Sequence, residues 1–246
     1  MMLGLFGKLC FWLPAYRRWR KTWPMGMSKT ARLFAYIDML FVDHALLRIF
    51  FRNLYCIHPG VWRSSQPSPS QIRSLKKMGI RSIINLRGDN KFGSYALELE
   101  ECKRQGIQLH SLRLYSQKMP SKEEVQVFLN VLQTVERPVL IHCKSGADRA
   151  GLASALVEVF DNDAGVAAAS AQLSFRYLHI KHAKAGLLDY FFQCYANYLM
   201  ENPELPDNKS TFLHWLRNIY NPDQLKDDFR VKPFFNWLVN VVLGRE

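Results

Sequence analysis

The chain has 246 residues, is 48% apolar, and carries 33 Lys or Arg against 21 Asp or Glu, a formal net charge of +12. This length fits one catalytic domain with extensions better than two large domains, and the apolar content is that of a globular protein. No stretch reaches the roughly 18 apolar residues of a membrane-spanning helix. Five scattered cysteines without pairing or metal-type spacing indicate free thiols in a reducing compartment.

Residues 1–52 are the basic part of the chain, with nine Lys or Arg and two acids. Aromatic residues alternate with cations there, in the run FGKLCFWLPAYRRWRKTWPMGM. This composition is typical of a segment that binds anionic lipid, and a basic surface helix packed on its own domain is the alternative. We expect a basic aromatic membrane-associating segment, with the protein peripheral on the cytoplasmic face of the inner membrane. A mitochondrial presequence is the minority interpretation.

Nucleic acid is not an expected partner, because nothing else in the chain supports such a surface. A second helical pattern follows at about 31–52, where apolar residues recur between charged ones.

From residue 53 onward the patterns of strands and helices alternate. Residues 62–67 are predicted to form a loop. Strands are predicted at 80–86, 107–114 and 139–142, and helices at 68–78, 94–105, 121–135 and 164–175. This alternation predicts an α/β fold with a central, largely parallel sheet flanked by helices.

The chain therefore divides into the basic segment 1–52, a catalytic domain at 53–200 and a helical C-terminal extension at 201–246. Three aromatic residues of that extension could belong to a core or to a second membrane contact: Phe234, Phe235 and Trp237.

Residues 139–156, VLIHCKSGADRAGLASAL, contain the most informative motif. A buried strand ends in Cys143, a glycine-bearing turn follows, and a helix begins near Arg149. Such a turn directs successive backbone N–H groups inward at the positive end of a helix, where they bind anions. The same amides would stabilise a Cys143 thiolate and hold a phosphate over it, and the planar guanidinium of Arg149 could grip two phosphate oxygens. Gly146 lets the backbone bend toward the anion, and Gly151 allows close packing where the helix starts.

The run from His142 to Arg149 resembles the His-Cys-x5-Arg signature of the cysteine-based phosphatases, the tyrosine and dual-specificity superfamily. The resemblance extends weakly over about residues 54–200. It implies a dual-specificity-phosphatase-like fold and a phosphocysteine mechanism that needs no cofactor. It further implies that Cys143 is the nucleophile, Arg149 the phosphate clamp and His142 a residue that tunes the thiolate. The loop residues that would cradle the phosphate are Lys144, Ser145, Gly146 and Ala147.

Two positions depart from the pattern of that superfamily. Most members carry Ser or Thr directly after the arginine, and here the residue is Ala150, so that Ser145 would have to compensate or turnover would be slow. The loop that usually supplies a general acid corresponds to residues 114–120 and contains no acidic residue. We therefore expect Asp148 to be the general acid, as in the similar Cys-x4-Asp-Arg loops of phosphoinositide phosphatases. Its alternative role is to orient Arg149 or the loop amides, and Asp89 is the reserve candidate.

Basic residues around the loop favour a polyanionic or lipid substrate. Lys144 follows the cysteine, and Arg87 and Lys118 are predicted to add positive charge for substrate binding. Together with the basic N-terminus they favour a lipid phosphate such as phosphatidylglycerophosphate, for which the loop resembles the bacterial phosphatases of this superfamily. The alternatives are a membrane-tethered protein tyrosine or dual-specificity phosphatase and a non-catalytic phosphate-binding module. His179 and His182 are expected to be surface residues and not metal ligands, and the oligomeric state stays open.

Overall fold

The structure is a computed structural model that describes residues 27–225. The aromatic and basic run before residue 27 and the aromatic residues after position 225 lie outside the described residues. The predictions of membrane contact made for those two stretches therefore stay predictions.

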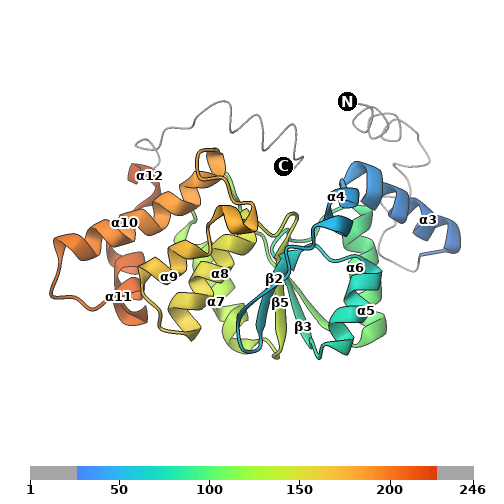
Figure 1. The fold of residues 1–246 in the computed structure, drawn as a ribbon, viewed down its shortest axis with the longest axis horizontal. Coiled ribbons are helices and arrows are strands. Elements are labelled where there is room, and N and C mark those ends of the chain that lie inside the picture. Colours follow the sequence, from blue (N-terminus) through green and yellow to red (C-terminus); the bar gives the residue numbers. More distant parts are fainter. Residues whose placement is uncertain (1–26, 226–246) are drawn as a thin grey trace.

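A five-stranded sheet forms the centre of the molecule (Figure 1). Its strands lie in the order β1-β2-β5-β3-β4, and neighbouring strands pair in parallel except for the edge pair β1 and β2. The strands span Tyr55–His58 (β1), Val61–Ser65 (β2), Ser82–Asn85 (β3), Gln108–Ser111 (β4) and Val139–Cys143 (β5). The predicted α/β class with a largely parallel sheet is confirmed.

The two central strands are buried on both faces, as expected for a sheet covered by helices on each side. On β3, Ile83 belongs to the core beside α5 (Pro69–Lys77) and α6 (Gly93–Gln105), and Ile84 belongs to the core on the opposite face. On β5, Leu140 and Ile141 divide in the same way. This two-residue alternation explains why the strand sequences are continuously apolar instead of alternating with polar residues.

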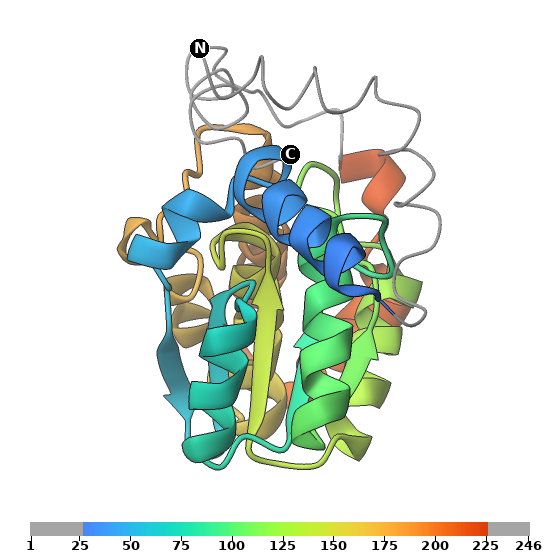
Figure 2. The same cartoon turned by 90° about the vertical axis from the view of Figure 1, so that its right-hand side faces the viewer.

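Helices cover both faces of the sheet (Figures 1 and 2). On one face α5 and α6 lie side by side, and α3 (Lys29–Ile37) packs on α6. The elements of the other face and its outer layer are α7 (Lys122–Thr134), α8 (Asp148–Asp161), α9 (Val166–Ala171), α10 (Leu187–Glu201), α11 (Lys209–His214), the π-helical turn η4 (Trp215–Ile219) and α12 (Pro222–Leu225).

Local sequence signals set several of the element boundaries. Ser68 and Ser121 cap α5 and α7 with complete capping boxes. In each box the serine side chain accepts the N–H of the third helical residue, and the side chain of that residue, Gln71 or Glu124, accepts the N–H of the serine. Gly106 ends α6 in the left-handed conformation at φ 62°. The predicted loop at 62–67 was wrong over residues 62–65, because these residues belong to strand β2.

The helical pattern predicted near 31–52 becomes an N-terminal arm of three short elements: α3, the π-helical turn η1 (Asp38–Val42) and α4 (Ala45–Phe50). Ala35 and Met39 of the arm share a small core with Ala96 and Leu97 of α6. The arm therefore packs directly on the domain that carries the cysteine motif. Within residues 27–225, none of the helices is both long and apolar enough to cross a bilayer.

The C-terminal elements share the main core of the domain. Phe212 and Trp215 lie in the same buried cluster as Phe191 of α10 and Leu156 of α8. The rings of Phe191, Phe212 and Trp215 pack edge-on or tilted, with centroid separations of 5.3–6.0 Å.

Candidate active site

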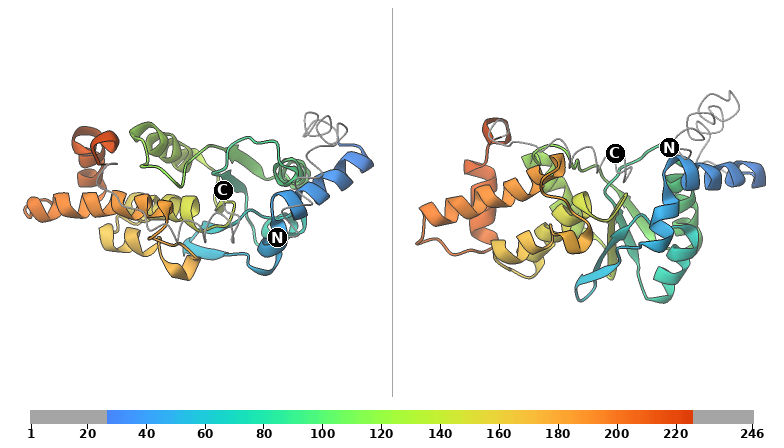
Figure 3. Two further views of the ribbon diagram at one scale, coloured as in Figure 1. Left: turned by 90° about the horizontal axis from the view of Figure 1, so that it is seen from above. Right: turned by 45° about the horizontal axis from the view of Figure 1, so that its top comes forward.

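Cys143 is the last residue of β5, a central strand of the sheet, and α8 begins five residues later at Asp148. The residues between them form a tight turn, so the cysteine lies at the carboxyl end of a parallel strand, where α/β proteins bind their ligands. Cys143 is 2% exposed. In Figures 1 and 3 this turn lies at the end of the central strand, on the same side of the molecule as α4.

Gly146 is required at the centre of the turn. Its φ is +74°, and a Cβ at this position would lie 2.6 Å from the carbonyl carbon of Ser64 and the amide nitrogen of Ser65. Both of these atoms belong to the backbone of β2, which has no room to move. The loop can therefore approach the neighbouring strand this closely only with glycine.

Arg63 supports the turn from behind, a role that sequence reasoning missed. Its guanidinium is fully buried and donates from Nη2 to the carbonyl oxygens of Gly146 (2.9 Å) and Ala147 (3.2 Å). Nη1 donates to the backbone and side-chain oxygens of Gln172, both at 2.9 Å. Burial lowers the pKa of Arg63 to about 10. The available signal was an arginine in the middle of an otherwise buried strand.

Asn53 joins the turn to the segment after α9. Its Nδ2 donates to the carbonyl oxygens of Ser145 (3.1 Å) and Tyr177 (3.0 Å). Asn53 is itself in the left-handed region at φ 50°. His142, the residue predicted to tune the thiolate, is fully buried, with Nε2 2.6 Å from Glu98 Oε1 of α6.

A pocket of about 230 Å³ opens beside the turn. Three residues that the sequence analysis named for phosphate binding line it together: Arg87, Lys144 and Arg149. The other lining residues are Asn90, Phe92, Arg113, Leu114 and Tyr115. None of these described lining residues is acidic, so the pocket suits an anion.

Arg87 and Lys144 meet a buried carboxylate that sequence reasoning did not single out. Asp43, between η1 and α4, accepts two bonds from Arg87, at 2.7 and 2.8 Å, and lies 3.7 Å from Lys144 Nζ. Burial lowers the pKa of Lys144 to about 8, while the Asp43 charge opposes that shift. Arg87 also donates to Gln66.

Asp148, the predicted general acid, is tied to a histidine. His179 Nδ1 lies 2.7 Å from Asp148 Oδ1, and His179 Nε2 lies 2.6 Å from Asp189 Oδ2 of α10. Both ring nitrogens face carboxylate oxygens, and only the doubly protonated ring donates to both. The two carboxylates raise the pKa of His179 to about 9 against the opposing effect of burial. His179 is therefore buried and bonded, although the sequence suggested a surface residue.

The remaining predicted residues lie around the pocket. Lys118 lies 3.6 Å from the ring centre of Tyr115, which lines the pocket, and 3.3 Å from Glu124. Asp89, the reserve acid, accepts from the Tyr95 hydroxyl at 2.5 Å. The Ser145 hydroxyl accepts the amide of Ala147 at 3.4 Å, inside the turn.

Comparison with known proteins identifies the family of this chain. Residues 58–184 match the family model described as "DSP-PTPase phosphatase fused to NAD+ Kinase". The chain belongs to this phosphatase family. The matched residues include β2, the Cys143 turn and Arg149, so they form a phosphatase domain of the dual-specificity and tyrosine-phosphatase type.

Several curated relatives are similar over part of their length. The chain is 35% identical over 102 residues to a beta-lactamase hydrolase-like protein of Xylella fastidiosa, covering 40% of this chain and 23% of that protein. It is 27% identical over 109 residues to the dual specificity protein phosphatase TpbA of Pseudomonas aeruginosa, covering 44% of this chain and 46% of TpbA. The similarity to inositol diphosphatase DSP4 of Arabidopsis thaliana is 31% over 140 residues, which is 50% of this chain and 67% of DSP4. The chain thus spans about a quarter to a half of the first two of these relatives.

Among solved structures, the core catalytic domain of the PP-IP phosphatase SIW14 from S. cerevisiae, in complex with citrate, matches with a TM-score of 0.49 and 20% identity. The match covers 64% of this chain and 97% of that chain. TpbA of P. aeruginosa in complex with pTyr matches with a TM-score of 0.46 at 21% identity, over 59% of this chain and 91% of that chain.

Proposed function

We propose that this phosphatase hydrolyses a phosphomonoester through a phosphocysteine formed on Cys143. The observation that carries the proposal is the position of Cys143: it ends a central parallel strand, directly before an amide-rich turn that opens into helix α8. The thiolate attacks phosphorus in line, the bond to the leaving oxygen breaks, and water later cleaves the S–P bond and releases phosphate.

The motif residues have separate parts in this proposal. The amides of residues 144–147 and the guanidinium of Arg149 bind the three non-bridging phosphoryl oxygens, whose charge they stabilise in the transition state. Asp148 protonates the leaving oxygen. Its carboxylate accepts a hydrogen bond from protonated His179, takes that proton as the bond to the leaving oxygen breaks and passes it to that oxygen, which leaves His179 neutral.

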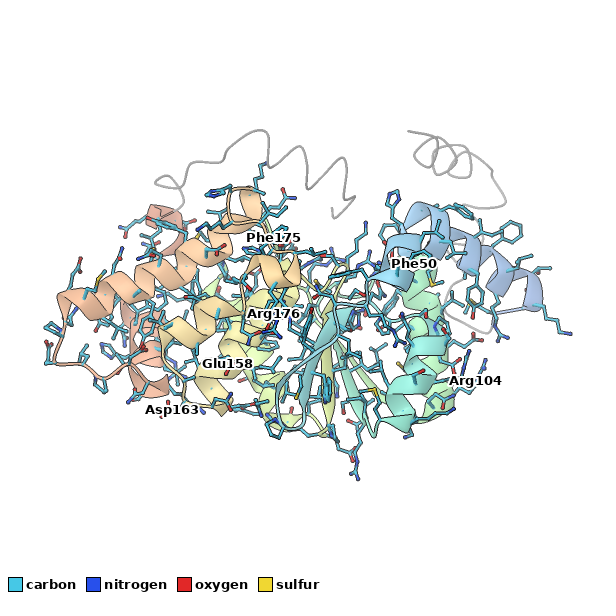
Figure 4. All side chains as sticks on the ribbon, in the orientation of Figure 1. Phe50, Arg104, Glu158, Asp163, Phe175 and Arg176 are labelled. Atoms are coloured by element: carbon cyan, nitrogen blue, oxygen red, sulfur yellow. The ribbon has the colours of Figure 1, made fainter. Side chains whose placement is uncertain are left out.

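The proposed substrate is a membrane lipid phosphate such as phosphatidylglycerophosphate. The cations that line the pocket support a strongly anionic substrate. Exposed aromatic side chains support a lipid surface: Phe50 is 87% exposed, and Phe175 is 74% exposed (Figure 4). Phe50 lies three residues before Asn53, and Phe175 lies two residues before Tyr177. The Asn53 side chain donates both to Tyr177 and to Ser145 of the Cys143 turn. The exposed residues Arg52 and Arg176 add positive charge to the same rim.

A membrane-tethered protein phosphatase is the second candidate. It is favoured by the similarity to TpbA, a dual specificity protein phosphatase, and by Tyr115 and Phe92 on the pocket wall, which could pack against an aromatic ring. The similarity to an inositol diphosphatase adds inositol diphosphates to the substrates worth testing.

A phosphate-release screen tests the proposal. The full chain is offered phosphatidylglycerophosphate in mixed micelles, a phosphotyrosyl peptide and an inositol diphosphate. Radiolabelled substrate is used to trap the phosphocysteine. We expect phosphate release to be greatest on the lipid, and Cys143→Ser to lose at least about a thousandfold, because the hydroxyl is a far weaker nucleophile.

Cys194→Ser is the matched control, since Cys194 is a partly buried cysteine on α10 that forms no disulfide. Faster phosphate release from the phosphotyrosyl peptide than from the lipid would favour the protein phosphatase over the lipid phosphatase. Full activity in Cys143→Ser, or a chain that binds phosphate without any turnover, would refute the enzyme proposal.

A further inference from the structure

The N-terminal arm places one buried carboxylate among the cations of the phosphate pocket. Asp43 is fully buried and lies outside residues 58–184, which match the phosphatase family. It accepts hydrogen bonds from Arg48 Nη2 (2.8 Å), from both terminal nitrogens of Arg87 and from Ser94 Oγ (2.6 Å). Its Oδ1 also lies 3.7 Å from Lys144 Nζ. One carboxylate therefore contacts cations from three separate parts of the chain.

These cations repel one another, and Asp43 offsets that repulsion. Burial lowers the pKa of Lys144 most, and the charges of Arg87, Arg48 and Arg149 lower it further, whereas Asp43 raises it. Burial lowers the pKa of His44, and the charge of Lys144 lowers it further, so His44 lies within electrostatic range of the same group. Further titratable neighbours on the Arg87 side are Glu98 of α6 and Cys143.

The backbone of the arm is bent to deliver this carboxylate. His44, the residue after Asp43, has φ 54°, a left-handed conformation that a non-glycine residue adopts only at an energetic cost. The bend separates η1 from α4, and it brings Asp43 and Arg48 to the same cluster. The packing of α3 on α6 holds the bend in place.

We propose that Asp43 is a positioning residue of the phosphate pocket, through which the N-terminal arm holds Lys144 and Arg87 against the bound phosphoryl group. The catalytic unit of this chain then extends beyond the matched domain to include the arm. The inference rests on the proposed function, because it takes the pocket to be the phosphoryl site.

Tungstate binding, measured by calorimetry on the full chain between pH 7 and 9.5, tests the proposal without requiring turnover. Tungstate stays a dianion across this range, so the titration of the protein alone sets the pH dependence. In the unmodified chain affinity should fall as pH rises through about 8, where Lys144 loses its proton. In Asp43→Asn the midpoint should move about one unit lower, and affinity at pH 8 should fall about fivefold.

Asp38→Asn is the matched control. Asp38 is equally buried in the same arm, and its carboxylate accepts the amide of Gly93, the first residue of α6, at 2.5 Å. We expect this variant to lose stability and to keep the midpoint of the unmodified chain. Arg48→Met should move the midpoint of the affinity curve upward, because Arg48 lowers the pKa of Lys144. This second variant keeps the proposal testable if Asp43→Asn does not fold.

The outcomes separate the two proposals. An unmoved midpoint in Asp43→Asn, or affinity that rises at every pH, would overturn the positioning role and leave the proposed function standing. If Asp43→Asn does not fold, an unmoved midpoint in Arg48→Met overturns the role. If the unmodified chain does not bind tungstate at all, both proposals fail.

Discussion

Gly146 is the residue on which the geometry of the cysteine turn depends most directly. We expect Gly146→Ala to lower the free energy of unfolding by about 2–3 kcal/mol, because the added Cβ meets the backbone of β2 and the φ of +74° is strained for alanine. Phosphate release should fall at least about a hundredfold, since a displacement of the amides by about 1 Å removes the oxyanion site. Urea denaturation and the release assay measure the two effects.

Gly106→Ala provides a matched control at the same scale. Gly106 also has a positive φ, of +62°, but a Cβ there would have no heavy atom within 4 Å. It should lose only about 1 kcal/mol, from the backbone conformation, and should keep its activity. Equal losses of activity in Gly146→Ala and Gly106→Ala would show that activity does not depend on the close approach of Gly146 to β2.

At the scale of elements, α8 and α10 are joined through His179. The ring contacts Asp148 at the start of α8 and Asp189 in the first turn of α10. Because the folded-state pKa of His179 is raised to about 9 from an ordinary 6.5, its stabilising contribution is fully present below about pH 6.5. That contribution is lost as pH rises through about 9.

The His179 contact between α8 and α10 predicts that stability depends on pH differently in the unmodified chain and in His179→Gln. From pH 6.5 to 9, the free energy of unfolding of the unmodified chain should fall by up to about 3 kcal/mol more than that of His179→Gln. Denaturant titrations at several pH values measure it. Parallel curves would mean that the imidazolium does not join the two helices, and His182→Gln, at a neighbouring exposed histidine, is the control.

At the scale of the whole molecule, the rim of exposed aromatic residues lies near the carboxyl ends of the parallel strands, where the cysteine turn also lies. Phe50→Ser with Phe175→Ser should reduce binding to vesicles of phosphatidylcholine and phosphatidylglycerol about tenfold, because two large apolar side chains no longer enter the interface. Co-sedimentation measures it. Met200→Ser is the control, since Met200 is 70% exposed at the end of α10. If the double variant and the control bind equally, the rim is not the membrane contact.

The sequence alone determined the class of the fold and the identity of the cysteine turn. Both depend on residues close together in the chain: the capping boxes at Ser68 and Ser121, the glycine at the end of α6, and the unbroken run from His142 to Arg149. Local backbone preferences and periodicity carry such features, so a single sequence is enough to predict them.

Only the tertiary structure decided which distant groups surround that turn. Arg63, Asn53, Asp43 and His179 come from four separate segments, and each meets the turn or its helix through contacts across 30 to about 100 residues of chain. Asp43 and His179 resemble ordinary surface residues in the sequence, because nothing in their neighbours signals burial. Packing of the arm on α6, and of α8 and α10 around one core, buries them. Burial makes their charges strong enough to shape the site.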